Sequence, residues 1–219
     1  MSYLKYNGQM VVSGGSYLTS PQLIMDGDGN IYSTVTIGTQ TWLTENLKTT
    51  KYINGTSIPN LVSNAAWAAD TTGAYCWYDN DESTYKDTYG ALYNWFVIEN
   101  VNDIAPTGTR VATKSDWDTL ISFLGGVSAA GGPLKDTGTV VWNSPNTGTN
   151  TTGFSARGGG NRRDTGVDFP DFGSNGFWWA DFESGNNGQR YYMFNNNNNV
   201  QSDVSLDKNW GLSIRCIVE

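Results

Sequence analysis

Alternation of β-branched and polar residues predicts a strand early in the chain. Within residues 31–37, Ile31, Val35 and Ile37 alternate with polar or aromatic positions. This period of two is typical of a half-buried strand. A Gly-Thr turn follows, so residues 40–43 are expected to return as the hairpin partner.

A different period predicts a helix over residues 115–124. Four apolar residues recur there at i, i+3, i+4 and i+7: Trp117, Leu120, Ile121 and Leu124. That spacing forms one apolar stripe on a helix. Ser115 is expected to cap its N-terminus, with Asp118 completing a capping box, and two glycines then end it.

A second helix is expected over residues 89–98. Leu92, Trp95 and Phe96 would share one of its faces. With the strands, these two helices indicate a mixed α+β fold.

Beyond residue 125 the chain is dominated by Gly, Asn, Ser, Thr and Asp, interrupted by three short apolar segments at 177–179, 190–194 and 212–218. We interpret these segments as aromatic strands separated by long polar loops. The last segment alternates so that the C-terminus is woven into the core. Five tryptophans are expected to fill that core: Trp42, Trp117, Trp142, Trp178 and Trp179.

The domain is expected to span residues 26–219, starting at the turn-forming run Asp26 to Asn30. Residues 1–25 carry little charge and are interpreted as a leader or attachment segment. They contain no apolar stretch of the kind that marks a secretory signal. The expectation is therefore a leader removed in cloning or a virion component that needs none.

Composition and charge exclude several classes of partner and of catalysis. Lys and Arg number 13 against 21 Asp and Glu, a net charge of −8. An acidic surface repels phosphate backbones and anionic membrane surfaces, so neither is an expected partner. No stretch approaches the ~20 apolar residues of a membrane span, so membrane insertion is not expected either. The chain has no histidine, which excludes histidine-based catalysis and imidazole ligands. Its two cysteines, Cys76 and Cys216, leave one disulfide or none open.

Two acidic segments were considered for calcium. Asp26 to Asn30 supplies the first three oxygen ligands of a calcium loop, but Ile31 and Ile37 stand where that loop needs glycine and glutamate. The run from Tyr78 to Glu82 also clusters oxygen ligands, as any solvated acidic turn does, and stays open as the calcium alternative. The sequence therefore predicts no cofactor.

The glycine run within residues 157–163 lacks the Gly-Lys-Ser/Thr ending of a phosphate loop. Close backbone packing is expected there instead of anion binding.

Seven ordered motifs carry a family resemblance. They are DGNIYSTVTIGTQTWLTENL (28–47), YCWYDND (75–81), YGALYNW (89–95), GTRVATKSDW (108–117), GFSAR (153–157), GFWW (176–179) and GLSIRC (211–216). This series resembles the Fibrobacter succinogenes major paralogous domain and covers residues 26–219. The family often has Trp and Pro where this chain has Thr109 and Ala112.

The resemblance implies a C-type-lectin-like fold of the formylglycine-generating-enzyme subtype. It would consist of a small antiparallel sheet, two helices and long irregular loops. Formylglycine-generating enzymes carry catalytic cysteines shortly after an Arg-Gly-Gly-Ser-like motif. Here the run from Arg157 to Gly160 is followed by no cysteine before Cys216. The resemblance therefore favours a protein that is not an enzyme, with an oxidase as the competing class.

The same fold includes the variable proteins of diversity-generating retroelements, whose C-terminal segments are rewritten at adenines. Residues 161–210 are rich in residues reachable from Asn codons, so this segment is the expected variable region. Its surface-loop candidates for ligand binding are Asn161, Arg163, Asp164, Asp168, Phe169, Asp171, Asn175, Asp181, Phe182, Asn187, Asn195, Asn197, Asp203, Ser205 and Asp207. Trp178, Trp179, Arg215 and Cys216 are expected to be scaffold, and Phe169 and Phe182 are weighed equally as ligand anchors or core.

The predicted function is binding of a cell-surface protein or glycan, as a receptor-binding adhesin in a phage or prophage tail. The alternative is a bacterial surface adhesin or lectin-like domain without diversification. By resemblance to tail adhesins, a homotrimer is expected.

Overall fold

The computed structural model describes residues 3–6, 9–12 and 23–219. The short strands β1 (Tyr3–Tyr6) and β2 (Gln9–Val12) pair as an antiparallel hairpin. The other strands are β3 (Ile24–Met25), β4 (Ile31–Tyr32), β5 (Thr34–Ile37), β6 (Gln40–Leu43), β7 (Tyr75–Cys76), β8 (Leu92–Tyr93), β9 (Thr109–Val111), β10 (Asn175–Ser184), β11 (Asn187–Phe194), β12 (Val200–Asp207), β13 (Ser213–Ile214) and β14 (Cys216–Val218). The helices are α1 (Asn64–Ala69), the 3₁₀ turn η1 (Tyr78–Asn80), α2 (Glu82–Tyr89), α3 (Phe96–Glu99), α4 (Lys114–Phe123) and α5 (Gly131–Leu134). The α+β class is confirmed.

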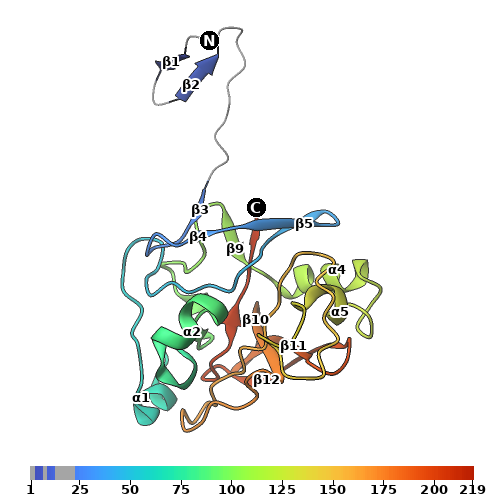
Figure 1. The fold of residues 1–219 in the computed structure, drawn as a ribbon. Helices are drawn as coiled ribbons and strands as arrows, with labels where there is room; N and C mark the ends of the chain where they lie inside the picture. Colours follow the sequence, from blue (N-terminus) through green and yellow to red (C-terminus); the bar gives the residue numbers. More distant parts are fainter. Residues whose placement is uncertain (1–2, 7–8, 13–22) are drawn as a thin grey trace.

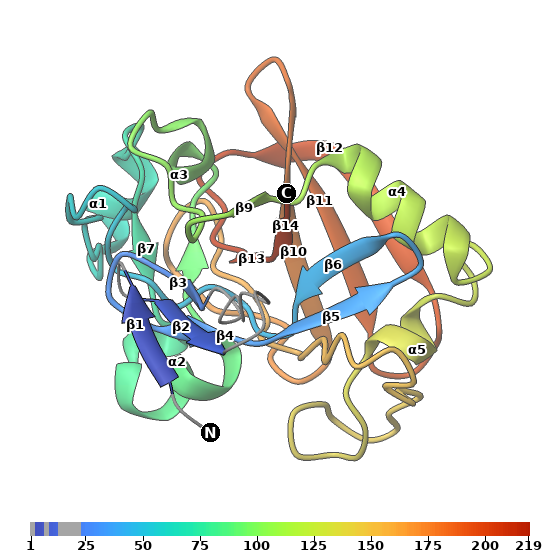
Figure 2. The ribbon, with the colours of Figure 1, turned by 90° about the horizontal axis from the view of Figure 1, so that it is seen from above.

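Two four-stranded sheets organise the domain (Figures 1 and 2). One has the order β12-β11-β10-β13 and the other the order β5-β6-β14-β9. The last strands connect them, because β13 pairs with β10 in the first sheet and β14 pairs with β6 and β9 in the second. The β10–β13 pairing is parallel, whereas the other strand pairs are antiparallel. The C-terminus is thus woven into the core, as predicted.

The predicted hairpin is present, with Val35 opposite Trp42. Its first strand, however, is split: residues 31–32 pair with β3 and residues 34–37 pair with β6. As a result Ile31 is exposed and Tyr32 is buried. Ile24 and Met25 are the last residues of the segment 1–25, which was interpreted as a leader or attachment segment. They form β3 and pair with β4 of the domain.

The helix predicted over 115–124 is α4, but its cap lies two residues earlier. The Thr113 hydroxyl accepts from the Asp116 N–H at 3.2 Å, and the Asp116 carboxylate accepts from the Thr113 N–H at 2.8 Å. This reciprocal pair is a capping box. Asp118 instead accepts a hydrogen bond from the Tyr191 hydroxyl, which ties α4 to the sheet.

The helix predicted over 89–98 is wrong. Helix α2 ends at Tyr89 because Gly90 has φ +77° and lies against Leu47, whose carbonyl oxygen would be 2.6 Å from a Cβ there. Leu92 then lies in β8, opposite Cys76. The apolar spacing reflects burial of this segment on several sides rather than one helix face.

The core contains the five predicted tryptophans, each at most 1% exposed. Trp117 joins α4 to the first sheet by stacking on Tyr191 at 5.1 Å between ring centroids. The scaffold residues Arg215 and Cys216 are also buried. Arg215 donates to the Leu43 and Phe154 carbonyls and to the Asn46 side chain, so its charge is surrounded by acceptors.

The glycine run 157–163 packs closely, as predicted. A Cβ on Gly158 would lie 2.9 Å from the Trp142 ring, and one on Gly160 would lie 2.6 Å from the Pro170 carbonyl oxygen. This space is filled by protein atoms.

Candidate functional site

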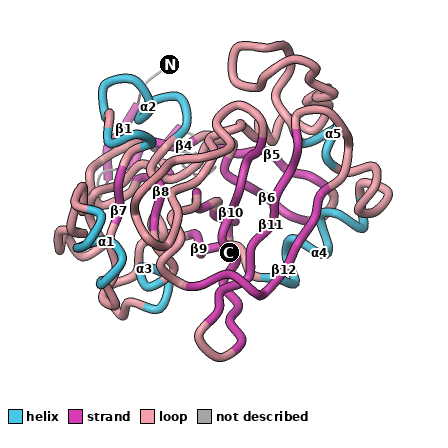
Figure 3. Tube along the Cα trace, turned by 90° about the horizontal axis from the view of Figure 1, so that it is seen from below, coloured by secondary structure: helices cyan, strands magenta, loops and turns pink. Residues whose placement is uncertain are grey.

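Strands β10, β11 and β12, which we call the ribbon, carry much of the segment predicted to bind ligand. They contain ten, eight and eight residues, so the expectation of short strands between long loops is wrong for this part. The ribbon faces the viewer in Figure 3, at the side of the molecule opposite β5. Candidate residues on regular strands are held more rigidly than residues on loops.

One face of the ribbon carries an ordered, half-buried cluster of aromatic and charged side chains. Arg190 lies opposite Asp203 and pairs with it at 2.9 Å. The Arg190 guanidinium lies 4.8 Å from the Tyr192 ring centroid, and Tyr192 stacks on Phe177 at 5.7 Å. Partial burial opposes ionisation of Asp203, but Arg190 outweighs it and lowers the pKa of that carboxyl. The cluster is therefore preorganised and charged at neutral pH.

The loop from Asn161 to Ser174 lies beside the ribbon and is anchored by Arg162. This side chain is fully buried, with its guanidinium 4.4 Å from the Trp67 ring centroid. It donates to the carbonyls of Leu61, Val62 and Gly166. Arg162 therefore holds the two ends of the exposed turn at 163–165 against α1.

Asn161 is the candidate whose predicted surface position is wrong. It is 1% exposed, and its amide nitrogen donates to Asp171 at 3.0 Å. The neighbouring Gly160, which packs under Pro170, draws Asn161 into the interior. Its side chain supports the loop from within.

Phe169 and Phe182, each considered as a ligand anchor or a core residue, differ in their burial. Phe169 is half-buried, with its ring 5.4 Å from Tyr78 and 5.1 Å from the Arg162 guanidinium. Phe182 is 44% exposed at the irregular end of β10. Of the pair, Phe182 has the apolar surface that a ligand could contact.

Two separate parts of the predicted segment meet in one hollow. Asp164 from the 161–174 loop and Asp207 at the end of β12 both line a cavity of about 190 Å³, together with Ala68, Thr165 and Asn209. Asn209 is fixed there, because its amide donates to the carbonyls of Trp67 and Asp70. The two carboxylates thus share a structured, water-accessible recess.

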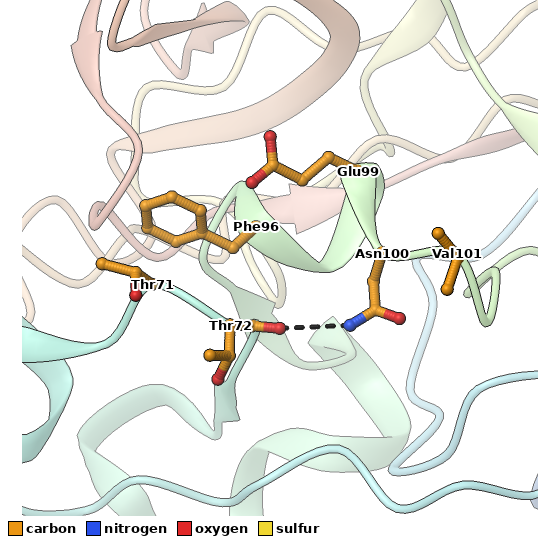
Figure 4. Close-up of a pocket in the computed structure, with 6 residues that line it drawn as sticks. All are labelled: Thr71, Thr72, Phe96, Glu99, Asn100 and Val101. Atoms are coloured by element: carbon orange, nitrogen blue, oxygen red, sulfur yellow. Dashed lines mark hydrogen bonds between the residues drawn. The ribbon is translucent and has the colours of Figure 1, made fainter.

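Two further hollows continue this recess. One of about 310 Å³ is lined by Thr71, Phe96, Asn186, Asp207, Lys208 and Asn209. The next, of about 330 Å³, is lined by Thr71, Thr72, Phe96, Glu99, Asn100 and Val101 (Figure 4). Because neighbouring hollows share lining residues, we treat the three as one feature, the underside groove. One wall is braced where the Asn100 amide donates to the Thr72 carbonyl at 3.2 Å.

Lys208 fixes the middle of the underside groove. Its ammonium lies 4.3 Å from the Trp95 ring centroid, pairs with Glu99 at 3.1 Å and also pairs with Glu183. Burial opposes the charge, but the two carboxylates outweigh it and raise the pKa of Lys208. This cation joins β10, α3 and the segment after β12.

The remaining candidates lie at other places. Arg163 pairs with Asp168 at 3.0 Å on the outside of the loop. Asp181, Phe182 and Asn187 lie at the end of the ribbon where β10 turns into β11, and Asn175, Asn195 and Asn197 lie towards its other end. Asp171 and Ser205 are exposed on the loop and on β12. The fifteen candidates therefore form several groups instead of one patch.

Sequence reasoning did not find Thr71, Phe96 and Lys208, which line the groove. Phe96 was expected on the apolar face of a helix, and Thr71 lies outside the segment 161–210. Lys208 lies inside that segment, but lysine is not among the residues reachable from Asn codons. Asn186 and Asn209 do belong to the asparagine-rich region, which was the available signal.

Both cysteines are free and buried. Burial raises the pKa of the Cys76 thiol to about 12 and raises that of Cys216 further. Thiols of this kind stay protonated and unreactive at neutral pH.

Both segments considered for calcium use their oxygens within the fold. The Asp26 carboxylate accepts from the Asn30 side chain and from the Tyr32 hydroxyl at 2.6 Å. Asp81 caps α2 by accepting from the Thr84 N–H. Within the described ranges, no three His, Cys, Asp or Glu side chains gather as metal ligands would. No described helix is long and apolar enough to cross a bilayer.

The chain belongs to the Fibrobacter succinogenes major domain family, whose model matches residues 35–218. The match includes both sheets, the ribbon and the underside groove. No curated protein and no solved structure matches the chain.

Proposed function

We propose that this protein is a ligand-binding module with a C-type-lectin-like fold and no catalytic activity. The observation that carries the proposal is the meeting of Asp164 and Asp207, from distant parts of the segment 161–210, in one groove beside a rigid ribbon. Carboxylates, asparagines and threonines around the half-buried Phe96 ring supply hydrogen bonds and apolar contact together. Such a combination is typical of binding surfaces.

The ligand is a protein or glycan on a cell surface. Asn186 and Asp207 offer amide and carboxylate groups to hydroxyls or peptide groups, and Phe96 offers an apolar floor. The Arg190–Tyr192 cluster on the ribbon adds two residue types that dominate binding energy in protein interfaces.

The binding test compares a groove variant with a control variant that removes the same number of carboxylates. Asp164→Ala/Asp207→Ala/Phe182→Ala alters the groove and the adjacent ribbon end. Glu82→Ala/Asp87→Ala alters exposed charges on α2 as the matched control. Labelled proteins are applied to a panel of bacterial cells and to a glycan array. We expect the groove variant to lose at least tenfold in binding with an unchanged melting temperature, and the control to bind normally. Equal binding by all three proteins would refute the groove as the ligand site.

We further propose that a retroelement diversifies residues 161–210 at adenines. Several of its Asn and Asp side chains lie in turns or on the exposed face of β12, where replacement removes little packing. The test is the DNA around the gene: a reverse transcriptase gene and a repeat of the gene's 3′ end that differs at adenines. Sister genes that vary mainly outside 161–210 would contradict the proposal.

As its setting we propose the tail of a phage or prophage, where the protein is a trimeric receptor-binding adhesin. The alternative is an adhesin on the bacterial surface. Electron microscopy of induced particles with a labelled antibody against this protein distinguishes them. Label at the tail tip supports the first setting, whereas label on the cell envelope with bare particles supports the second.

The competing class is a copper oxidase of the formylglycine-generating type. The two thiols argue against it, because they lie in separate buried clusters and carry raised pKa values. The test is incubation with Cu(I) and a cysteine-containing peptide. Stoichiometric copper binding with loss of the peptide thiol would establish the oxidase instead.

A further inference from the structure

A buried lysine holds the turn between β11 and β12. Lys135 follows α5 and is 0% exposed. Its ammonium donates to the Thr147 hydroxyl at 2.8 Å and to the carbonyls of Phe194, Asn195 and Asn197 at 2.6, 3.1 and 2.7 Å. The ammonium therefore fills an oxygen cage that the turn wraps around.

The cage contains oxygen dipoles and no carboxylate. None of the ion pairs among residues 3–6, 9–12 and 23–219 includes Lys135. The Trp142 ring, with its centroid 5.6 Å from the ammonium, adds further stabilisation of the charge. A cation surrounded by several carbonyl oxygens is how proteins bind ions such as calcium, and here a side chain supplies that cation.

The Lys135 side chain contacts the main chain of the turn, not its side chains. The Asn195 amide donates to the Asn143 carbonyl, and the Asn197 amide donates to Asn196, so both side chains point to partners other than the ammonium. A second contact is also to the backbone: the Gly131 N–H donates to the Asn198 carbonyl at 2.9 Å. Residues 195–199, which we call the Asn turn, are thus held largely through their main chain, and the Asn197 side chain adds a contact within the turn by accepting from the Asn199 N–H.

We propose that Lys135 is a positioning residue that acts as an internal cation and fixes the Asn turn by its carbonyls, so that the side chains of the turn other than Asn197 can change without loss of the turn's shape. The inference rests on the proposed function, since it explains how a variable turn stays ordered. Main-chain recognition makes the turn a frame on which different ligand contacts can be displayed.

The test is amide hydrogen exchange of the full chain without any ligand. Lys135→Met keeps the length and apolar stem of the side chain but removes the cation. We expect exchange of amides 195–199 to accelerate at least tenfold while amides 183–187 keep the wild-type rate. Lys86→Met, which removes a partly exposed cation on α2, is the matched control and should leave both segments unchanged. An increase under twofold at 195–199, or a uniform increase over the whole domain, would overturn the positioning role.

A second variant keeps the inference testable if Lys135→Met does not fold. Asn195→Ala/Asn196→Ala/Asn198→Ala retains Lys135 and also Asn197, whose side chain accepts from the Asn199 N–H. We expect wild-type exchange rates throughout the turn, and acceleration like that expected for Lys135→Met would refute the inference. Both measurements are independent of ligand binding, so loss of the proposed function would show in the cell and glycan assays and not here.

Discussion

The two ends of the ribbon are built differently. At the Asn turn, Lys135 binds the carbonyls of Phe194, Asn195 and Asn197. The Gly131 N–H binds the Asn198 carbonyl. At the other end, residues 182–187, which we call the ribbon tip, five successive residues are exposed and Gly185 has no other group within 4 Å of a Cβ placed on it. The ion pair between Glu183 of the tip and Lys208 holds the tip by a side chain and not by its main chain. The Asn turn is thus fixed through its main chain by groups outside the ribbon, whereas the tip is held by the pairing of Ser184 with Asn187 and by a side-chain ion pair.

The difference teaches that exposure and order are separate properties of a binding surface. A fixed turn loses little conformational entropy on binding, whereas a free tip loses more but can adjust to its ligand. The following predictions test this contrast, beginning with the largest expected effect.

Insertion of Gly-Ser at either end of the ribbon should give the largest difference in unfolding free energy between the Asn turn and the tip. Between Asn196 and Asn197 the insertion displaces carbonyls that the ammonium binds, and we expect a loss of about 3 kcal/mol in unfolding free energy. Between Gly185 and Asn186 it lengthens an exposed two-residue hairpin turn, which costs under about 1 kcal/mol. Urea denaturation measures both, and equal losses would show that the Asn turn is no better anchored than the tip.

Single glycine substitutions give the next largest contrast. A Cβ on Gly131 would lie 2.8 Å from the Asn198 carbonyl oxygen, so Gly131→Ala must push the Asn turn away at a cost of about 2 kcal/mol. Gly185→Ala meets no neighbour and adds only the strain of φ +61°, about 1 kcal/mol. Thermal unfolding compares them. A Gly131→Ala protein as stable as wild type would mean that the turn yields easily.

The pH dependence of stability tests the lysine itself. Burial lowers the pKa of Lys135 to about 8, whereas an unfolded lysine titrates near 10.4. Between these values the folded chain binds fewer protons than the unfolded chain, so stability should rise with pH in wild type relative to Lys135→Met. The slope should approach about 1.4 kcal/mol per pH unit. Paired urea titrations at pH 8, 9 and 10 measure it, and a falling difference would show that the oxygen cage outweighs burial.

Side-chain truncation at the tip should have the smallest effect. Ser184→Ala/Asn186→Ala/Asn187→Ala removes polar groups from a segment with little packing, and we expect a change below about 0.5 kcal/mol. Differential scanning calorimetry measures it. A loss of 2 kcal/mol would mean that the tip is as constrained as the Asn turn.

The elements with a clear period of apolar residues could be predicted from the sequence. The hairpin at 34–43, helix α4 and the buried tryptophans follow from alternation and spacing. The helix over 89–98 failed because apolar spacing cannot reveal that Gly90 turns the chain with φ +77° into a buried two-residue strand.

The candidate site was less predictable because it depends on long-range contacts. Asparagine and aspartate content located the segment 161–210, which includes Asp164 and Asp207 of the groove. Nothing local indicates that Thr71 and Phe96 form the opposite wall, or that Lys135 is buried among carbonyls. A lysine is expected at the surface, and only the assembled fold supplies its four acceptors.

The free thiols have a consequence for how the protein is made. Cys76 and Cys216 lie in different hydrophobic clusters and remain reduced, so no covalent cross-link contributes to the fold. The chain can therefore reach its native shape in the reducing cytoplasm without an oxidant or a disulfide isomerase. Burial also shields both sulfurs from oxidants in solution, and their separate clusters keep them apart, so the thiols need no protection when the surroundings become oxidising.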